Sequence, residues 1–263
     1  MAYNNINFLI EDGVGIITLN RPEVLNSFNR EMGKEVQGAF SRAGENAEIR
    51  AILLTGEGRA FCAGQDLEEA APPNGSPPPE IGLIVRQTYN PIIRFIRNIE
   101  KPVVCAVNGV AAGAGANIAL ACDFVITSEK ATFIQAFCKI GLIPDSGGTY
   151  FLPRLVGIPR AAAMMMLGDK INAQEALEMG LIHNVFPEEI FRDESLKFAK
   201  YLATKPTKGL GLIKKALNQS LSNDLETQLE LEAKLQSEAG ATVDSKEGIQ
   251  AFLEKRIPKF IGR

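Results

Sequence analysis

Two loops rich in glycine and alanine have residue types that could bind a reacting group. One reads RAFCAGQDL at residues 59–67 and the other NGVAAGAGAN at 108–117, each between a strand-like and a helix-like run. Small residues let the backbone approach a ligand closely, and the first N–H groups of a helix lack partners within it. Two such amides converging on one point would hold a negatively charged oxygen, as an oxyanion hole does. Such loops also serve plain helix–strand packing, so their composition alone leaves both interpretations open.

The elements that must position these loops are those of an α/β fold. Runs of β-branched residues alternate with helical patterns, which is typical of βα units. The expected strands are 14–19, 51–55, 103–107 and 123–127. Apolar residues at helical spacing predict helices at 30–46 and 81–99, which would cover the faces of the sheet.

The last third of the chain has a different pattern. Strand signals end near residue 196, and helical patterns follow at 196–203, 207–220, 225–239 and 245–255. We therefore expect a core at residues 1–195 that holds the site, and a separate helical module at 196–263. The segment APPNGSPPPE, residues 71–80, has too many Pro and Gly for a regular element and is expected to be a mobile surface loop suited to act as a lid.

Composition excludes several classes of protein. The chain has 263 residues, of which 46% are hydrophobic, and its formal net charge is −3, so no cationic excess favours nucleic acid as the main partner. The four cysteines form no C-x-x-C pair and are expected to be reduced and buried, and no metal site is expected. The stretch MAYNNINFLIEDGVG has no basic region followed by an apolar core, and no apolar run approaches the roughly 20 residues of a spanning helix, so neither secretion nor membrane insertion is expected. We therefore expect a cytoplasmic protein without membrane contact.

Five stretches together resemble the crotonase (enoyl-CoA hydratase/isomerase) family over nearly the whole chain, in the family's order and spacing. They are GIITLNRPEVLNSF, RAFCAGQDL, KPVVCAVNGVAAGAGANIALACDF, GLIPDSGGTYFLPRLVG and EGIQAFLEKRIPKF. The resemblance implies a crotonase-like spiral core of ββα turns and a helical C-terminal trimerisation region. It also implies a homotrimer or a dimer of trimers, and an acyl-CoA thioester as substrate. Coenzyme A would be part of that substrate, and no further cofactor is expected.

By position in the family, the donors of the oxyanion hole are the backbone N–H groups of Gln65 and Ala114. Each such donor would lower the barrier to forming an enolate by about 3 kcal/mol. The resemblance also places coenzyme A against Val24, Leu25, Ala63, Asp66 and Leu67. Lys255 and Lys259 would supply cations for its phosphates, from the same or a neighbouring subunit. Ordinary core packing and a solvated helix face are the alternative roles for these residues.

The hydratases of the family activate water with two glutamates, and the matching positions here are Asn117 and Phe137. Neither side chain exchanges a proton near neutral pH, so hydration by paired carboxylates is not expected. Asn117, Phe137, Ile140 and Leu142 are instead expected to line the acyl pocket.

Asp145 lies where several isomerases and dehalogenases of the family have their working carboxylate. An apolar pocket would raise its pKa toward the working pH, which suits a group that accepts and returns a proton. The segment around it, with GVAAGAGAN, is most similar to the branch that converts ring-1,2-epoxyphenylacetyl-CoA to an oxepin-CoA, and a shift of a 3-enoyl double bond to the 2-position needs the same groups. Its structural alternative is a turn residue or a helix N-cap, because Pro-Asp-Ser-Gly suits both.

Three other functions are alternatives to isomerisation. The first is an enoyl-CoA hydratase. The second is an aryl-CoA dehalogenase, which in the family relies on a Trp and a His, whereas this chain has no Trp and only His183, for which a surface or structural role is expected. The third is a non-catalytic relative that binds acyl-CoA or RNA. Exchange of the proton next to the thioester would distinguish an enzyme from a binder.

Overall fold

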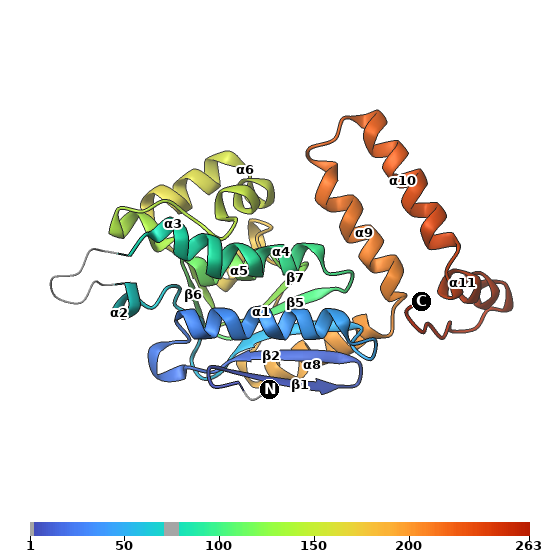
Figure 1. Ribbon diagram of the computed structural model, residues 1–263, viewed down its shortest axis with the longest axis horizontal. Helices are drawn as coiled ribbons and strands as arrows, with labels where there is room; N and C mark the ends of the chain where they lie inside the picture. The colour runs from blue at the N-terminus through green and yellow to red at the C-terminus, as the bar shows by residue number, and fades with distance from the viewer. Residues whose placement is uncertain (1–2, 71–78) are drawn as a thin grey trace.

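The computed structural model describes residues 3–70 and 79–263, so most of the segment expected to form a lid lies outside the described residues. Figure 1 shows an α/β body, with a hairpin of two helices and a last short helix on its right-hand side. The predicted α/β class is confirmed. In the described part of the chain, no helix is long and apolar enough to cross a membrane.

The larger sheet has six strands. Their order across the sheet is β1 (Ile6–Glu11), β2 (Val14–Leu19), β3 (Ala51–Gly56), β5 (Val103–Val107), β7 (Phe124–Ser128) and β10 (Asn184–Phe186). Only β1 runs antiparallel to its neighbour, and the other pairs are parallel. All residues of the central strand β5 are buried, as expected for a parallel sheet covered on both faces.

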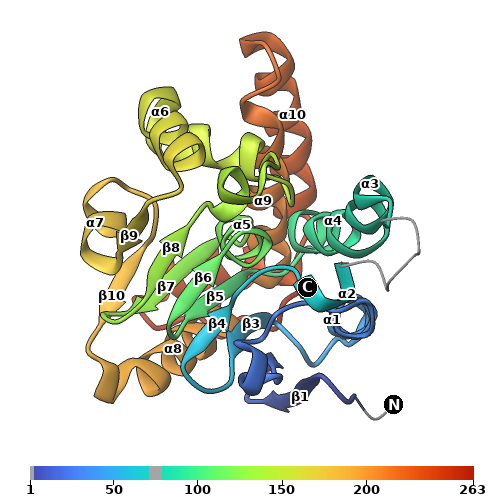
Figure 2. The same ribbon diagram turned by 90° about the vertical axis from the view of Figure 1, so that its left-hand side faces the viewer.

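A second sheet lies beside the first and consists of very short strands (Figure 2). Its order is β4 (Ala60–Cys62), β6 (Val110–Ala112), β8 (Thr132–Ile134) and β9 (Lys170–Asn172). The first three follow directly after β3, β5 and β7. The chain thus passes three times from the long sheet to the short one and on into helices, which is the spiral of ββα turns.

Helices cover the sheets. They are α1 (Arg30–Glu45), α2 (Leu67–Ala70), α3 (Ile81–Ile84), α4 (Asn90–Asn98), α5 (Ala114–Leu120), α6 (Gly148–Leu167), α7 (Ala173–Glu178) and α8 (Glu188–Ala203). Asn29 caps α1 by accepting a hydrogen bond from the N–H of Met32, and Met32, Val36 and Phe40 bury one face of that helix. Three single-turn segments are η1 (Pro22–Val24), the π-helix η2 (Val85–Tyr89) and the 3-10 helix η3 (Ala136–Ile140).

The C-terminal helices are α9 (Thr207–Ser220), α10 (Leu225–Gly240) and α11 (Val243–Glu254), close to three of the predicted ranges. The expected boundary at residue 196 falls inside α8 instead. Phe191, Ala199 and Leu202 of that helix pack on the long sheet, so α8 is part of the core. The helical pattern alone did not show that its apolar face covers strands.

Candidate functional site

The two small-residue loops pack directly on each other. Gly64 has a left-handed backbone, and a Cβ atom placed on it would lie 3.0 Å from the carbonyl oxygen of Ala112 and 3.6 Å from the nitrogen of Ala114. A Cβ atom on Gly115 would lie 2.5 Å from the carbonyl oxygen of Cys62. Small residues are therefore required where the loops meet, because any larger side chain would push the loops apart.

The backbone on either side of Gln65 is fixed by Phe28. The N–H of Phe28 donates to Gly64 (2.7 Å), and the N–H of Asp66 donates to the carbonyl of Phe28 (2.9 Å). Because groups alternate along an extended chain, the N–H of Gln65 points away from Phe28. Ala114 begins α5, so its N–H has no acceptor within that helix. Both predicted oxyanion donors thus belong to loops in contact, with N–H groups that these elements leave available.

Asp145 lies half-buried in the loop between η3 and α6. Its Oδ1 accepts a hydrogen bond from the Ser146 hydroxyl at 2.8 Å, and no Lys, Arg or His of the described residues pairs with it. Burial raises the pKa of this carboxyl group, and the Ser146 hydroxyl opposes the rise. The N-cap of α6 is Gly147 and no side chain caps it, so Asp145 is not the helix cap that its sequence context allows.

Asn117 braces the backbone of Asp145. Its Nδ2 donates to the carbonyl oxygen of Asp145 (2.9 Å), and its Oδ1 accepts from Nε2 of Gln135 (2.8 Å). Its residue exposure is only 1%, and a Cβ atom on Gly148 would come within 2.3 Å of Nδ2. Asn117 therefore holds the loop of Asp145 with one end of its side-chain amide, while Gln135 fixes the other end.

The other three residues expected to line the acyl pocket differ in how deeply they are buried. The ring of Phe137 is buried beside the second loop, since a Cβ atom on Gly113 would lie 3.7 Å from its Cζ. Ile140 is 56% exposed and Leu142 is 37% exposed. The structure thus places Phe137 next to Ala114, whereas Ile140 and Leu142 lie near the surface of the single chain.

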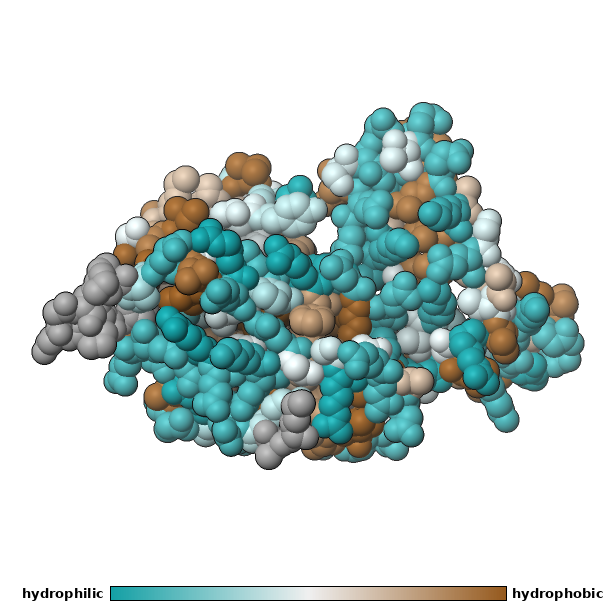
Figure 3. Space-filling view, viewed as in Figure 1, coloured by the Kyte–Doolittle hydropathy of each residue, from teal (hydrophilic) through white to brown (hydrophobic). Residues whose placement is uncertain are grey.

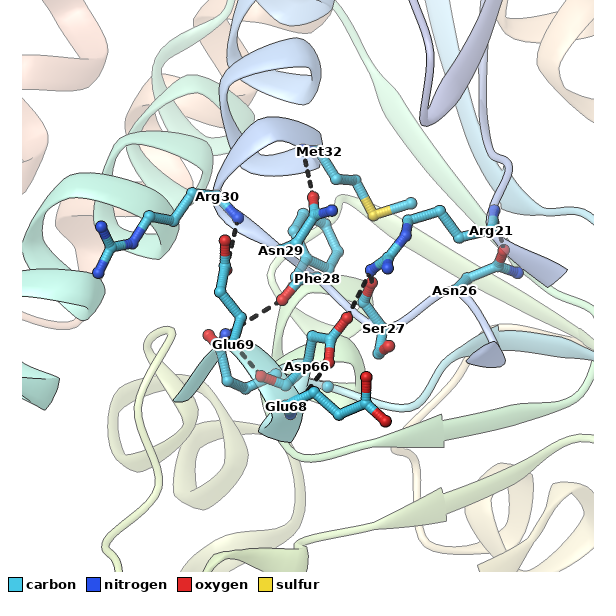
Figure 4. A network of polar contacts seen from close by, with 12 residues as sticks. Arg21, Asn26, Ser27, Phe28, Asn29, Arg30, Met32, Asp66, Glu68 and Glu69 are labelled. Atoms are coloured by element: carbon cyan, nitrogen blue, oxygen red, sulfur yellow. Dashed lines mark hydrogen bonds and ion pairs between the residues drawn. The ribbon is translucent and has the colours of Figure 1, made fainter. Parts of the chain in front are cut away.

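Most residues expected to bind coenzyme A are brought together. The N–H of Ala63 donates to the carbonyl of Leu25 at 3.0 Å, next to the exposed side chain of Val24. Asp66 accepts from the guanidinium of Arg21 at 2.9 Å (Figure 4). The exposed Leu67 begins α2. The Asp66 carboxylate is therefore engaged within the protein, and its backbone N–H and carbonyl are engaged as well, with Phe28 and with the Gln65 side chain.

Lys255 and Lys259 lie elsewhere. Lys255 ends α11, and the N–H of Lys259 is held by Glu247 at 2.7 Å. Figure 1 shows α2 and α11 at opposite ends of the molecule, so the two lysines and the loop of Ala63 are not brought together in one chain.

His183 packs against aromatic rings. Its ring centroid lies 5.5 Å from that of Phe124 and 5.4 Å from that of Phe198. These contacts agree with the structural role expected for it. Among residues 3–70 and 79–263, no group of three or more His, Cys, Asp and Glu could hold a metal ion.

Three polar residues of this region were missed by the sequence analysis. Arg21 and Gln135 act through partners 45 and 18 positions away along the chain. Tyr89 belongs to η2, within a stretch that the sequence predicts to be plain helix, and its hydroxyl donates to Gln65 (2.6 Å). No sequence periodicity marks such contacts.

Nearly the whole chain is similar to known proteins of one family. Residues 9–263 match the family described as "Enoyl-CoA hydratase/isomerase". The chain is 48% identical to the 1,2-epoxyphenylacetyl-CoA isomerase of Escherichia coli K12, over 97% of each chain. It is also 48% identical to a probable enoyl-CoA hydratase of Rhodobacter capsulatus, over 100% of each.

Solved structures of similar proteins have the same fold. A putative enoyl-CoA hydratase of Streptomyces coelicolor A3(2) superposes with a TM-score of 0.93 at 34% identity, covering 100% of this chain and 96% of that one. An enoyl-CoA hydratase subunit of Geobacillus kaustophilus gives 0.91 at 35% identity, covering 99% of each.

Proposed function

This chain belongs to the enoyl-CoA hydratase/isomerase family, and from that premise we propose that it is an acyl-CoA isomerase. The crotonase-like fold expected from the sequence is confirmed by the solved structures. As a family member the protein is an enzyme that acts on CoA thioesters. Which reaction it catalyses is the subject of the proposal.

The observation that carries the proposal is the half-buried carboxylate of Asp145, which has no cation partner among the residues that the structure describes. The α-proton of a thioester is only weakly acidic, so a base must act while the enolate oxygen is stabilised. Asp145 takes the proton next to the thioester, and the N–H groups of Gln65 and Ala114 hold the oxygen. The raised pKa then lets the same carboxyl group return the proton to another carbon, so the product is an isomer of the substrate.

The first-ranked substrate is 2-(1,2-epoxy-1,2-dihydrophenyl)acetyl-CoA, an intermediate of phenylacetate catabolism. Loss of its α-proton lets electrons shift into the ring and open the strained epoxide toward the seven-membered oxepin. The relative in E. coli that bears this activity's name supports the assignment. A 3-enoyl-CoA is the second substrate, since moving its double bond needs the same proton transfer.

An enoyl-CoA hydratase is the second candidate function, because a relative named as a probable hydratase has the same 48% identity. Against it, Asn117 uses its amide to brace the Asp145 loop, and Phe137 has no group that could activate water. Asp145 would then have to activate water alone. Isomerisation needs only one carboxylate.

The test is a comparison of three thioesters with the purified protein. We expect turnover of the ring-epoxidised phenylacetyl-CoA and of a 3-enoyl-CoA, followed by mass and ultraviolet absorption, and little addition of water to crotonyl-CoA. Efficient hydration of crotonyl-CoA without isomerisation would overturn the proposal in favour of a hydratase.

We also propose that copies of the chain assemble into a trimer or a dimer of trimers. Figure 3 shows apolar patches on the α9–α10 hairpin, where Ile213, Leu217, Leu225 and Leu229 are exposed in the single chain. In such an assembly Lys255 and Lys259 would reach the phosphates of coenzyme A on a neighbouring copy. Sedimentation at a mass of one 28.5 kDa chain would contradict this assembly.

A further inference from the structure

The hydroxyl of Tyr89 contacts the side chain of Gln65, a residue of the first small-residue loop. Tyr89 is only 1% exposed, and its hydroxyl lies 2.6 Å from Oε1 of Gln65. The Nε2 of Gln65 donates to the carbonyl oxygens of Phe28 (3.1 Å) and Asp66 (3.2 Å). The side-chain amide of Gln65 is thus held at both ends.

The direction of this amide is determined by its neighbours. If the amide were reversed, its oxygen would face the two carbonyl oxygens of Phe28 and Asp66, and acceptors would oppose each other. Nε2 must therefore face these carbonyls, and Oε1 must face Tyr89. Since Oε1 can only accept, Tyr89 has to be the donor.

Tyr89 is itself rigidly placed. It ends the π-helix η2, and its ring centroid lies 5.9 Å from that of Phe28. The adjacent Thr88 packs closely on α1, since a Cβ atom on Gly33 would lie 2.4 Å from Cγ2 of Thr88. A π-helical turn is rare in proteins, and the few that occur are often found at functional sites. Burial, together with nearby Cys62 and Asp145, raises the pKa of the Tyr89 hydroxyl, so it remains a donor throughout the neutral range.

From this geometry we infer that Tyr89 is a positioning residue, which fixes the Gln65 side chain and through it the direction of the Gln65 N–H that grips the substrate carbonyl. The inference rests on the proposed function, in which that N–H is an oxyanion donor. The hydroxyl touches no reacting atom. It holds one residue of the loop, and a small tilt of the donor weakens its bond to the oxygen.

The first test removes the hydroxyl alone, in Tyr89→Phe, with Tyr150→Phe on the surface of α6 as the matched control. We expect kcat for the isomerisation to fall about tenfold, which is less than the 10²–10³ for deleting an oxyanion donor, with KM changed less than about twofold. The control keeps the wild-type kcat. An unchanged kcat in Tyr89→Phe, or an equal loss in Tyr150→Phe, overturns the inference.

The second test asks whether Tyr89 acts through Gln65. Gln65→Met removes the amide and retains the length of the side chain. If the pair acts as a unit, the double variant loses little more than either single variant. Losses that multiply would show independent roles and overturn the inference.

A spectroscopic readout makes the test independent of turnover. Butyryl-CoA labelled with ¹³C at its carbonyl is bound to each variant, and the carbonyl stretching frequency is measured by infrared difference spectroscopy. We expect a shift to lower frequency in the wild type and a smaller shift in Tyr89→Phe. Equal shifts in both, or none in the wild type, overturn the positioning role. Should the wild type polarise this carbonyl but isomerise no thioester, only the proposed isomerisation fails.

Discussion

Two aspartates of this chain, Asp123 and Asp145, have opposite electrostatic surroundings. Asp123 lies at the start of β7 and accepts from Lys214 (2.7 Å), Arg97 (3.2 Å) and the N–H of Val103 (2.8 Å). Asp145 has one hydroxyl partner and no cation among the residues that the structure describes. Both residues are partly buried, so burial alone does not distinguish them.

If Asp145 is the base, as proposed, the difference separates an aspartate that supports the fold from one that carries out chemistry. The two cations at Asp123 compensate a charge that ties α4 and α9 to the long sheet. At Asp145 the charge is left uncompensated, and the desolvation that raises its pKa is the property that a proton carrier needs. The structural work at position 145 is done by its backbone carbonyl, which accepts from Asn117 and Gly148.

The largest expected effect is on catalysis, in Asp145→Asn. We expect kcat to fall about a thousandfold, because the proposed base is lost, while the melting temperature stays the same or rises because an unpaired charge is removed. Exchange of the α-proton of an acyl-CoA into deuterium oxide should stop as well. Asp193→Asn, at an exposed position on α8, is the matched control. Near-normal turnover in Asp145→Asn would remove the proposed mechanism.

The same substitution at the other aspartate should have the opposite result. Asp123→Asn leaves Lys214 and Arg97 without their carboxylate, and Lys214 is almost fully buried. We expect the free energy of unfolding to fall by about 3 kcal/mol, measured by denaturant titration, with kcat per folded molecule retained. Equal stability of Asp123→Asn and Asp145→Asn would contradict the difference between a compensated charge at Asp123 and an uncompensated one at Asp145.

The dependence on pH provides a third test. Asp145 must be ionised to accept a proton, so kcat/KM should fall about tenfold per pH unit below the pKa of this group, which burial raises above its ordinary value of 3.8.

The pH dependence of stability has the opposite sign, because acidification lowers activity but removes the destabilisation due to Asp145. Between 3.8 and the raised pKa the folded state binds more protons than the unfolded state, so the destabilisation due to Asp145 disappears as pH falls through that window. The stability difference between the wild type and Asp145→Asn should therefore shrink on acidification. A constant difference would show that the carboxyl group is not desolvated.

The smallest effect is expected for Asn117→Leu, which removes the brace and keeps the branched shape of the side chain. The Asp145 carbonyl retains its bond from Gly148 (2.8 Å), so the loop should loosen without unfolding. We expect kcat to fall about tenfold, with a loss of about 1–3 kcal/mol in stability because Gln135 loses its acceptor. Asn98→Leu, at an exposed position, serves as the control; a full loss of activity in Asn117→Leu would instead indicate direct chemistry at Asn117.

Sequence patterns predicted the long elements well, for physical reasons. β2 and β5 have the predicted bounds, because β-branched runs buried on both faces leave a clear signal. The strands β4, β6 and β8 have three residues each, too few for any periodicity. The resemblance to the family placed the loops of Gln65 and Ala114, whereas the brace at Asn117 and the contact at Tyr89 depend on packing between distant segments.

The repeated passage from the long sheet to the short one has a consequence for how this enzyme could acquire new chemistry. Gln65, Ala114 and Asp145 follow β4, β6 and β8, so each successive coil of the chain contributes one of them. A change in one coil can alter a single functional group and leave the other two, with the framework beneath them, in place. In such an architecture, substitutions confined to one coil can change the reaction one functional group at a time.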